Sequence, residues 1–414
     1  ASGKCGENVY WGLSAEGVLT IWGEGEMEED ATDTIRNNYK DQVLSLVIGS
    51  GVTKVASWAF SHFDSLSKVS LSEGVVSIGE GGFYDCENLT TIQFPSTLRS
   101  IGQYGFRYCS GLTTIQIPEG VTNIYNRTFE GCTALENVDF PSSLTKIDTS
   151  AFYNCSSLKS VVIPDSVVSI NDSAFALCEN LTNVKLSSSL TTINYDVFRR
   201  CYALESIEIP EGITSIEDYA FLDCSNLKTV TIPSTLTSIK SAFGGCTALE
   251  TVKIKDLAGW CSIDTYSTPL YYANELQINN VTVTDLVIPD TVTEVKGYTF
   301  RGFKGLHSVV FPDSVTRIDG SAFEQCAGLT SVTISSSLKS IGLCAFNDCP
   351  NLTDVYYMGT EKQWKEITVE SVNDPFPNAT VHCLGGLAIT AQPQDYVGAV
   401  GSNAAFSVAA DGME

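Results

Sequence analysis

The chain has 414 residues, more than one compact core usually holds, so its length predicts two or three domains unless the fold is elongated. Its net charge of −24 argues against a nucleic-acid partner, whose phosphates would be repelled, and against a polybasic membrane-binding surface. No apolar run approaches the roughly 18 residues of a membrane-spanning helix, so we expect no membrane insertion within this chain. The first residues lack a charged and apolar leader, so any secretory signal is expected to be absent already.

Residues 1–41 differ from the rest of the chain and are predicted to form an N-terminal cap. Val9 and Trp11 alternate with polar neighbours. After an Ala-Glu-Gly stretch typical of a turn, Leu19 and Ile21 alternate in the same way, which indicates a β-hairpin. An atypical first unit is expected in a stacked array because the first coil would otherwise expose its apolar end.

From residue 42 onward a 23-residue unit repeats, and a phenylalanine marks each copy. These phenylalanines are Phe60, Phe83, Phe106, Phe129, Phe152, Phe175, Phe198 and Phe221, then Phe243 after 22 residues, and Phe300, Phe323 and Phe346 after an interruption. A cysteine lies three residues beyond most of them, and a leucine three residues further on. A fixed period of this length is the signature of a stacked repeat array, and about twelve units fill residues 42–386.

Each unit is predicted to hold a short strand. In one unit apolar and polar residues alternate with a period of two, so Ile92 and Phe94 face inward. Thr91 and Gln93 then face outward. Pro95 ends the strand because it has no N–H to continue a ladder. The sequence therefore predicts an α/β repeat solenoid of about twelve 23-residue units with parallel strands stacked at ~4.8 Å, behind a β-hairpin cap.

The corner after each strand alternates between two forms. Glu119, Asp165 and Glu211 stand in every second unit, whereas the units between them carry serine there, which gives a 46-residue super-repeat. Skipping a unit doubles the spacing of like charges to ~10 Å, near the screening length at physiological salt. Duplication of a two-unit block explains the alternation equally well, and the sequence leaves both explanations open.

Two longer units, 255–285 and 355–383, break the period. Each combines a Trp-x-x-Ile stretch expected on a short helix, at Trp260 and Trp364, with a proline-containing corner and a closing strand. Each tryptophan is predicted to fill the wider core of its longer coil. The alternative for the first unit is a protruding aromatic contact site. Its residues are Tyr266, Tyr271 and Tyr272.

Residues 387–414 lose the period altogether. The stretch containing Ile389, Pro393, Tyr396 and Phe406 resembles the opening strands of an immunoglobulin-like sandwich. Such a domain needs ~100 residues, so we interpret this stretch as its truncated start.

The repeat unit reads A-F-x-x-C-x-x-L-x-x-V-x-I-P-x-x-V-x-x-I over residues 151–170 and resembles the BspA-like leucine-rich repeats. The cap and the unit around Trp364 are similar to the segments that begin and end such arrays. The resemblance implies a secreted or surface-displayed bacterial protein, often of anaerobic gut or oral residents. Relatives are linked with adhesion to host matrix proteins or to other bacteria. The family defines no binding motif that transfers to particular residues of this chain.

The residues that catalysis or metal binding would need do not gather in the sequence. His62, His307 and His382 lie in separate units, so a nucleophile–base pair is not expected. Zinc sites need closely spaced cysteines, and the nearest spacing here is Cys344 to Cys349. We therefore expect no catalytic residue, no cofactor and no metal site.

The cysteines of the repeats are expected to be buried and reduced. Side chains at equivalent positions of stacked coils point in parallel, which is a poor start for the ~90° torsion of a disulfide. Phe63 and Phe303 replace the cysteine in the first unit of each run, which indicates a site for a buried apolar group. Cys86 through Cys246 are therefore predicted to be structural.

The candidate binding face is the outward row of the strand ladder. It consists of Gln93, Gln116, Asp139, Val162, Lys185, Glu208, Thr231 and Lys253. The row is polar and mixed in charge, and it is interpreted either as a solvated sheet face or as a low-affinity contact face. We predict a non-enzymatic secreted or cell-surface binding and adhesion module whose partner is a host matrix or surface protein, or a glycan. The alternative is a purely structural spacer that displays other domains.

Overall fold

The structure is a computed structural model that describes residues 1–373, 379–385, 388–391 and 409–411. The chain divides into two compact units, Ala1–Lys255 and Asp256–Glu414. The division falls at the start of the longer repeat predicted over 255–285, where the 23-residue period is first interrupted.

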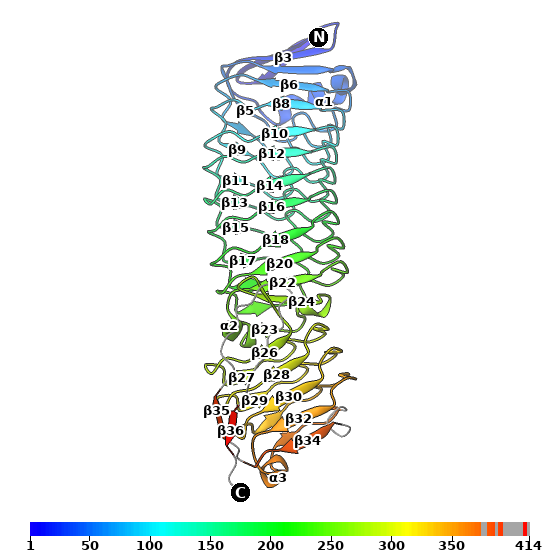
Figure 1. Ribbon diagram of the computed structural model, residues 1–414. Helices are drawn as coiled ribbons and strands as arrows, with labels where there is room; N and C mark the ends of the chain where they lie inside the picture. The colour runs from blue at the N-terminus through cyan, green and yellow to red at the C-terminus, as the bar shows by residue number, and fades with distance from the viewer. Residues whose placement is uncertain (374–378, 386–387, 392–408, 412–414) are drawn as a thin grey trace. The chain divides into compact units, whose positions relative to one another are not determined.

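The N-terminal cap is an antiparallel meander followed by a short helical segment (Figure 1). Strands β1 (Ser2–Gly6), β2 (Asn8–Leu13) and β3 (Val18–Glu26) pair in order, which confirms the predicted hairpin. The long strand β3 then pairs in parallel with β4 (Ser45–Ile48) through its first half and with β5 (Val52–Val55) through its second half. The cap thus starts two strand ladders at once. Helical turns η1 (Asp30–Thr32), α1 (Asp33–Tyr39) and η2 (Lys40–Gln42) complete it.

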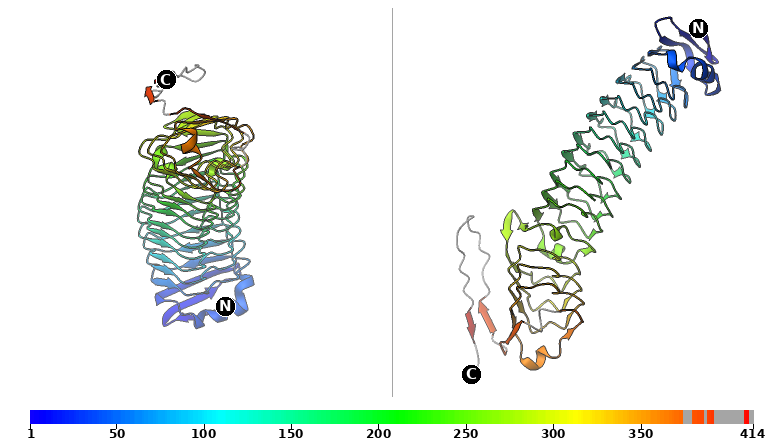
Figure 2. Two further views of the ribbon diagram at one scale, coloured as in Figure 1. Left: turned by 90° about the horizontal axis from the view of Figure 1, so that it is seen from below. Right: turned by 90° about the vertical axis from the view of Figure 1, so that its right-hand side faces the viewer.

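Successive coils of the first unit contribute strands to two rows of parallel strands, so the unit is a column of stacked coils (Figure 2). We call each row a ladder, although its strand pairing is interrupted at two places. The first ladder comprises β4 (Ser45–Ile48), β6 (Lys68–Leu71), β8 (Thr91–Gln93), β10 (Thr114–Gln116), β12 (Asn137–Asp139), β14 (Ser160–Val162), β16 (Asn183–Lys185), β18 (Ser206–Glu208), β20 (Thr229–Ile232) and β22 (Thr251–Ile254). The second comprises β5 (Val52–Val55), β7 (Ser77–Ile78), β9 (Ser100–Ile101), β11 (Asn123–Ile124), β13 (Lys146–Ile147), β15 (Ser169–Ile170), β17 (Thr192–Ile193), β19 (Ser215–Ile216) and β21 (Ser238–Ile239). The predicted solenoid of stacked parallel strands is confirmed, and a second, shorter strand per coil is added to it.

The core of the first unit is built around the repeated phenylalanines. From Phe60 to Phe243 the rings stack on one another with centroids 5.1 to 5.7 Å apart and planes within 20° of parallel. Offset parallel stacking at this spacing is a favoured arrangement of aromatic rings. All of these rings are buried. Because each ring contacts one in the coil before and one in the coil after, the core is continuous along the column.

Turns, rather than a helix, carry each phenylalanine. The Phe106 N–H donates to the Thr128 carbonyl of the next coil at 2.8 Å, and Tyr104 and Tyr108 donate to that coil in the same way. Tyr104 and Tyr108 have φ values of 58° and 63°, and positive φ recurs two residues before and after the phenylalanine in most coils. This left-handed conformation is uncommon for residues other than glycine. With this conformation on both sides of the phenylalanine, the backbone directs three N–H groups of each turn toward carbonyl groups of the next coil.

The second unit repeats the same design after a longer first coil. That coil holds α2 (Leu257–Cys261), β23 (Asp264–Thr265), η3 (Pro269–Tyr271), β24 (Glu275–Ile278) and β25 (Val281–Val283). One ladder follows with β26 (Asp285–Val287), β28 (Ser308–Val310), β30 (Ser331–Ile334), β32 (Asp354–Tyr357) and β34 (Thr380–Cys383). The other holds β27 (Glu294–Val295), β29 (Arg317–Ile318), β31 (Ser340–Ile341) and β33 (Thr368–Val369), and α3 (Glu361–Trp364) lies in the last coil.

The two tryptophans of the longer coils lie on the predicted short helices. Trp260 of α2 is buried. Trp364 of α3 is half-buried and packs on Tyr357 with ring centroids 5.3 Å apart. Asp256 caps α2 by accepting from the Ala258 N–H at 3.0 Å. The proline corner predicted for the last unit lies outside the described residues.

The predicted opening of an immunoglobulin-like domain over residues 387–414 lies mostly outside the described residues. Of this stretch the structure describes β35 (Ala388–Ala391) and β36 (Ala409–Asp411), which pair in an antiparallel manner. A single antiparallel pair does not define a sandwich, so the immunoglobulin-like interpretation is not supported.

Candidate functional site

The predicted binding face lies along the first ladder of the first unit. Parallel pairing sets Gln116 beside Asp139, Val162 beside Lys185, and Glu208 beside Thr231. Within the row, Gln93, Gln116, Asp139, Val162, Lys185 and Glu208 are exposed, whereas Thr231 and Lys253 are half-buried. The structure thus brings these eight residues onto one continuous surface, which we call the ladder face.

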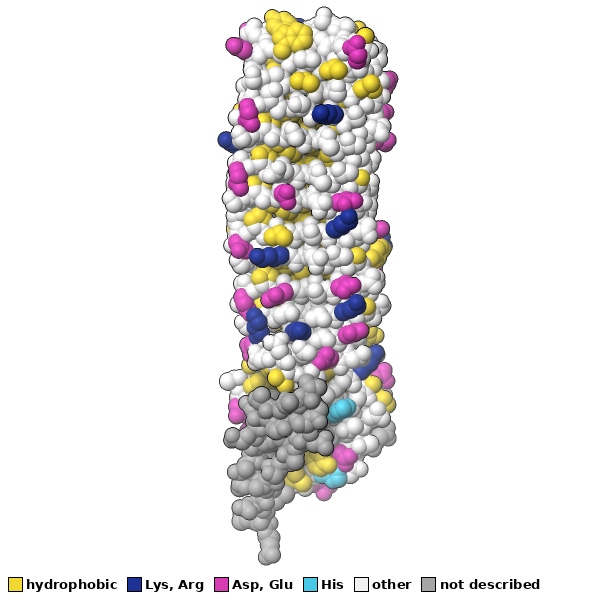
Figure 3. All heavy atoms as spheres, turned by 45° about the horizontal axis from the view of Figure 1, so that its top comes forward, with side chains coloured by type: hydrophobic (Ala, Val, Ile, Leu, Met, Phe, Trp, Pro, Cys, Tyr) yellow, Lys and Arg dark blue, Asp and Glu magenta, His cyan; other side chains and the backbone are white. Residues whose placement is uncertain are grey.

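The charges on and beside the ladder face are mixed. At its edge Lys159 forms an ion pair with Glu136 at 2.6 Å, and Lys228 pairs with Glu205 at 3.5 Å, each across adjacent coils. Figure 3 shows acidic and basic side chains interspersed on the surface rather than gathered by sign. Val162, with 61% of its surface exposed, is the most apolar member of the row. Such a surface suits a polar, weakly held protein contact better than a hydrophobic one.

The three tyrosines proposed as an aromatic site are all in the first coil of the second unit. Tyr271 and Tyr272 contact edge to face with ring centroids 5.2 Å apart. The Arg301 guanidinium lies over Tyr271 at 5.6 Å and over Tyr298 at 5.7 Å. Tyr266, between β23 and η3, is 61% exposed. Tyr266 and Tyr271 are thus exposed and Tyr272 is half-buried, and their role as a contact site stays a prediction. The sequence did not indicate the arginine that packs on Tyr271.

A larger aromatic group in the first unit went unnoticed in the sequence because its members come from three different positions of the repeat as well as from three coils. It consists of Trp58, His62, Tyr84, Tyr104, Arg107 and Tyr108, and we call it the aromatic cluster. The Trp58 and Tyr84 rings lie 5.5 Å apart, and the His62 ring contacts Tyr84 at 5.3 Å. The signal that could have revealed it is the run of aromatic residues beside Phe60, Phe83 and Phe106 in three successive repeats, whereas later repeats carry single tyrosines at these positions, such as Tyr153 and Tyr219.

The acidic corners of the super-repeat have a structural role that neither earlier explanation included. Glu119 accepts hydrogen bonds from the Ser142 N–H at 3.0 Å and from its hydroxyl at 3.2 Å. In return the Ser143 hydroxyl accepts from the Gly120 N–H at 2.9 Å. The same acid-to-serine contact joins Glu73 to Ser96, Asp165 to Ser188 and Glu211 to Ser234. Each acidic corner therefore locks onto the serine corner of the following coil.

These contacts also set the ionisation of the acids. Donation from the Ser142 backbone N–H and hydroxyl holds the pKa of Glu119 below its usual value. The Ser96 backbone N–H and hydroxyl lower the pKa of Glu73, and those of Ser188 lower the pKa of Asp165. Hydrogen bonds to the charged form favour that form, so the corners are tightest when the carboxylates are ionised.

The repeat cysteines are buried free thiols, as predicted. The Cys132 Sγ lies 3.2 Å from the Phe106 carbonyl of the preceding coil, and the Cys109 N–H donates to that same oxygen at 3.1 Å. The thiol thus satisfies the second lone pair of a buried carbonyl. Burial raises the pKa of Cys178 to about 12, so the thiolate needed for reaction is scarce.

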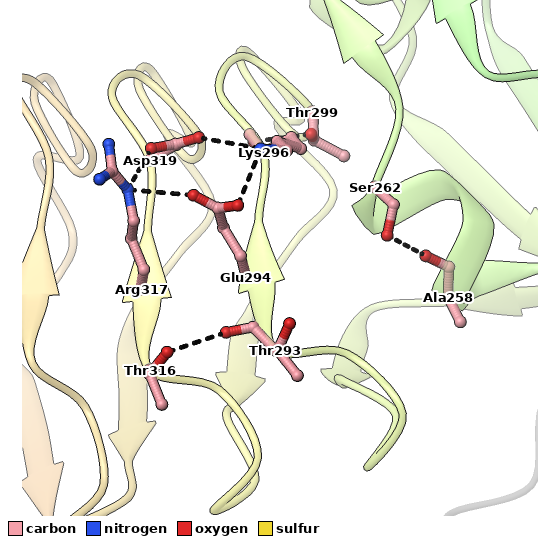
Figure 4. Close-up of polar contacts among 9 residues, drawn as sticks. All are labelled: Ala258, Ser262, Thr293, Glu294, Lys296, Thr299, Thr316, Arg317 and Asp319. Carbon is pink, nitrogen blue, oxygen red and sulfur yellow. Dashed lines mark hydrogen bonds and ion pairs between the residues drawn. The ribbon is translucent and has the colours of Figure 1, made fainter.

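On the second ladder of the second unit, four charged residues form a network (Figure 4). Arg317 pairs with Asp319 at 2.6 Å and with Glu294 at 3.0 Å, and Lys296 pairs with Glu294 at 2.8 Å. The hydrogen bond that the Lys296 ammonium donates to the Glu294 carboxylate raises the pKa of Lys296. The network joins β27 to β29. Because its two positive and two negative charges balance, it offers no net charge to a ligand.

Within the residues that the structure describes, no group of three or more His, Cys, Asp or Glu side chains is placed to hold a metal ion. None of the helices in that part of the chain is long and apolar enough to cross a membrane.

Stacked coils, two parallel ladders and a leucine-bearing core place this protein in the class of leucine-rich repeat solenoids. The chain belongs to the BspA-type leucine-rich repeat family: a family profile described as "BspA type Leucine rich repeat region (6 copies)" matches residues 37–159, 145–267 and 276–372. Proteins of this type are protein-binding modules of the cell surface. No curated protein matches the chain at a significant level.

Three solved structures of leucine-rich repeat proteins are similar to this chain. A leucine-rich repeat protein from Bacteroides ovatus is 27% identical, with 88% of this chain and 98% of that chain covered and a TM-score of 0.50. A leucine-rich cell-surface protein from Faecalibacterium prausnitzii is 24% identical, covering 88% and 97%, with a TM-score of 0.43. A leucine-rich repeat protein from Eubacterium ventriosum is 20% identical, covering 96% and 98%, with a TM-score of 0.41.

Proposed function

We propose that this chain is a non-enzymatic binding module, secreted or displayed on a cell surface, whose ladder face contacts a host matrix or surface protein. The observation that carries the proposal is the continuous exposed row from Gln93 to Glu208, which varies in side-chain type while the buried positions of the same coils are nearly constant. Membership of a family of surface-located, protein-binding proteins supports it.

Recognition by the ladder face would be polar and of modest strength. Lys185 and Glu208 offer charges of opposite sign at equivalent positions of strands β16 and β18 in neighbouring coils. No exposed aromatic anchor lies among the eight residues of the row. Aromatic and arginine anchors contribute most of the energy in tight interfaces. A face without them is suited to reversible contact, strengthened when many copies act together.

The test is binding of the chain to a panel of immobilised extracellular-matrix proteins, measured by biolayer interferometry at low and physiological salt. Joint substitution of Gln116, Asp139, Lys185 and Glu208 by alanine is expected to abolish the detected binding. A matched control replaces Asn123, Ser169 and Ser215 on the second ladder, which should leave binding unchanged. Binding that survives the ladder-face substitutions would show that this face is not the contact surface.

A structural spacer is the second candidate. The observation that favours it is that Lys159 and Lys228 already have acidic partners on their own surface. A spacer predicts no specific binding to any matrix protein on the panel, which distinguishes it from the module.

A further inference from the structure

The outward row of the first ladder in the second unit differs in chemistry from the ladder face of the first unit. Strands β26, β28, β30, β32 and β34 lie side by side in this ladder (Figure 1). Parallel pairing sets one outward residue of each strand beside that of the next. These residues are Val287, Val310, Thr333, Tyr356 and His382, and we call them the valine–tyrosine row.

This row exposes apolar surface to solvent. Val287 is 50% exposed and Tyr356 is 37% exposed, whereas Val310, Thr333 and His382 are half-buried. The His382 ring stacks on the Tyr356 ring with centroids 4.9 Å apart and planes inclined by 16°. Because this contact restricts the Tyr356 side chain, less side-chain entropy is lost when a partner contacts it.

Strand pairing does not require apolar residues at these positions. The equivalent row of the first unit forms parallel strands of the same kind with Gln116, Asp139, Lys185 and Glu208. Packing of the core does not require them either, because inward residues such as Val309 are the ones that fill it. Exposed apolar surface with a polar border is typical of protein contact sites.

The formal charges in the strands and corners around the valine–tyrosine row are all negative. Asp285 and Asp354 stand two residues before members of the row, so their side chains leave the same face of the sheet. Asp290 and Asp313 are exposed in the corners after β26 and β28. No Lys or Arg occurs in the five strands and the corners after them, which are residues 285–290, 308–313, 331–336, 354–359 and 380–385.

The two acids within the strands keep the capacity to bind a cation. The His382 Nε2 lies 2.8 Å from the Asp354 Oδ1, and this contact, together with donation from the Thr353 hydroxyl, lowers the pKa of Asp354. Asp285 accepts from the Ser308 hydroxyl at 2.6 Å. A carboxylate accepts up to about four hydrogen bonds, so both acids retain sites for an ammonium or guanidinium donor.

Charge complementarity decides the kind of partner. A basic polypeptide with apolar side chains among its Lys and Arg residues matches both the row and its acidic border. The chain's own residues 386–414 contain three acids and no Lys or Arg, so they do not match. A second copy of the chain, with a net charge of −24, would be repelled.

We propose that the valine–tyrosine row is a docking surface for a basic polypeptide segment. Val287 and Tyr356 make the apolar contacts, and Asp285, Asp290 and Asp313 pair with Lys or Arg side chains of the partner. The surface lies in the second unit, and the chemistry of its partner differs from the mixed polar contact proposed for the ladder face.

The first experiment pans a phage library of random peptides on the immobilised whole chain. Peptides that combine Lys or Arg with branched or aromatic side chains are expected to be enriched. A synthetic copy of an enriched peptide is then titrated by fluorescence anisotropy, and its affinity should fall between about 0.05 M and about 0.5 M salt. Enrichment of neutral or acidic peptides alone, or of none, would overturn the proposal.

A competition with spermine tests whether the apolar contacts matter. Spermine is a cation without branched or aromatic side chains, so it is expected to displace the peptide only at much higher concentration. Displacement at equal concentration would show that the carboxylates act alone and would also overturn the proposal.

Two sets of substitutions separate the row from its acidic border. Val287→Thr with Tyr356→Thr keeps residues that suit a strand and should weaken the affinity for the peptide about tenfold. Asp285→Asn, Asp290→Asn and Asp313→Asn together should weaken it about tenfold at low salt and remove most of its salt dependence. Full affinity in either folded variant would place the peptide elsewhere.

The matched control is Val76→Thr with Val168→Thr, which changes exposed valines of the first unit just before β7 and β15. It should leave peptide binding unchanged. Thermal melts monitored by circular dichroism show whether each variant is folded. If the variant with Tyr356→Thr does not fold, Val287→Thr alone remains as the test and should weaken the affinity about threefold.

The alanine substitutions on the ladder face should leave binding of the basic peptide unchanged. The substitutions on the valine–tyrosine row should likewise leave binding to the matrix-protein panel unchanged, so each of the two proposals can fail without the other.

Discussion

Replacing Phe152 by alanine would remove one ring from the middle of the aromatic stack. Phe152 is fully buried between Phe129 and Phe175, with ring centroids 5.3 Å away on both sides. Burying a phenylalanine removes at least ~150 Å² from water, and at ~25 cal/mol per Å² this contributes about 4 kcal/mol. Measured losses for large-to-small core substitutions of this kind are about 3–5 kcal/mol. We therefore expect the free energy of unfolding to fall by about 4 kcal/mol.

The location of the damage is a second readout, since a repeat array transmits stability between neighbours. Guanidinium unfolding followed by circular dichroism gives the total loss. Native-state hydrogen exchange should show the greatest loss of protection at the Phe129 and Phe152 amides, which bond to the next coils. Val162→Ala in the same coil, at a 61% exposed position, is the control and should change stability by less than ~0.5 kcal/mol. A loss below ~1 kcal/mol for Phe152→Ala would refute the view that the ring stack holds the coils together.

Three further outcomes are expected. Of the 14 cysteines, Cys344 and Cys383 are the partly exposed ones. A thiol reagent should therefore modify these two first and the other cysteines only after unfolding. Rapid modification of all thiols in the native chain would contradict the burial of the repeat cysteines. The folded-state pKa of Glu119 is lowered, so its contribution to stability is present above the unfolded-state pKa and is lost as the pH falls through the folded-state pKa. Glu119→Gln should therefore flatten the fall in the free energy of unfolding below about pH 4. An unchanged fall would show that the Ser142 contact does not contribute to stability. Glu294→Gln should lower the free energy of unfolding by about 0.5–1 kcal/mol at low salt and by less at 1 M salt, measured by thermal melts. A decrease that does not depend on salt would indicate lost packing and not lost charge pairing.

The sequence predicted the parts of this fold that depend on spacing within one unit. The period-two pattern around Ile92 placed the strand, and the fixed interval from Phe83 to Phe106 placed one phenylalanine in each coil, although not the stacking of their rings. What it could not predict depends on backbone conformation imposed by neighbours. Ser150 and Tyr104 adopt positive φ without being glycine, because their N–H groups bond to carbonyls of the next coil.

The candidate sites divide in the same way. The ladder face followed from alternation along single strands, so Gln116 and Lys185 could be assigned to it in advance. The aromatic cluster combines three positions of the repeat. Trp58 and Tyr104 stand at one position two units apart, but Tyr84 comes from another position, and its ring contacts depend on how the side chains leave the turn.

The lock between acidic and serine corners has a consequence for how this gene can change in length. Glu73, Glu119, Asp165 and Glu211 each need a serine corner directly after them. In the first unit, loss or gain of a single 23-residue coil would place two corners of the same type next to each other, whereas loss or gain of a 46-residue block keeps every one of these contacts. The second unit already has acidic corners in consecutive coils, at Asp290 and Asp313, so the constraint applies to the first unit. Recombination within that unit should therefore be tolerated best in steps of two coils.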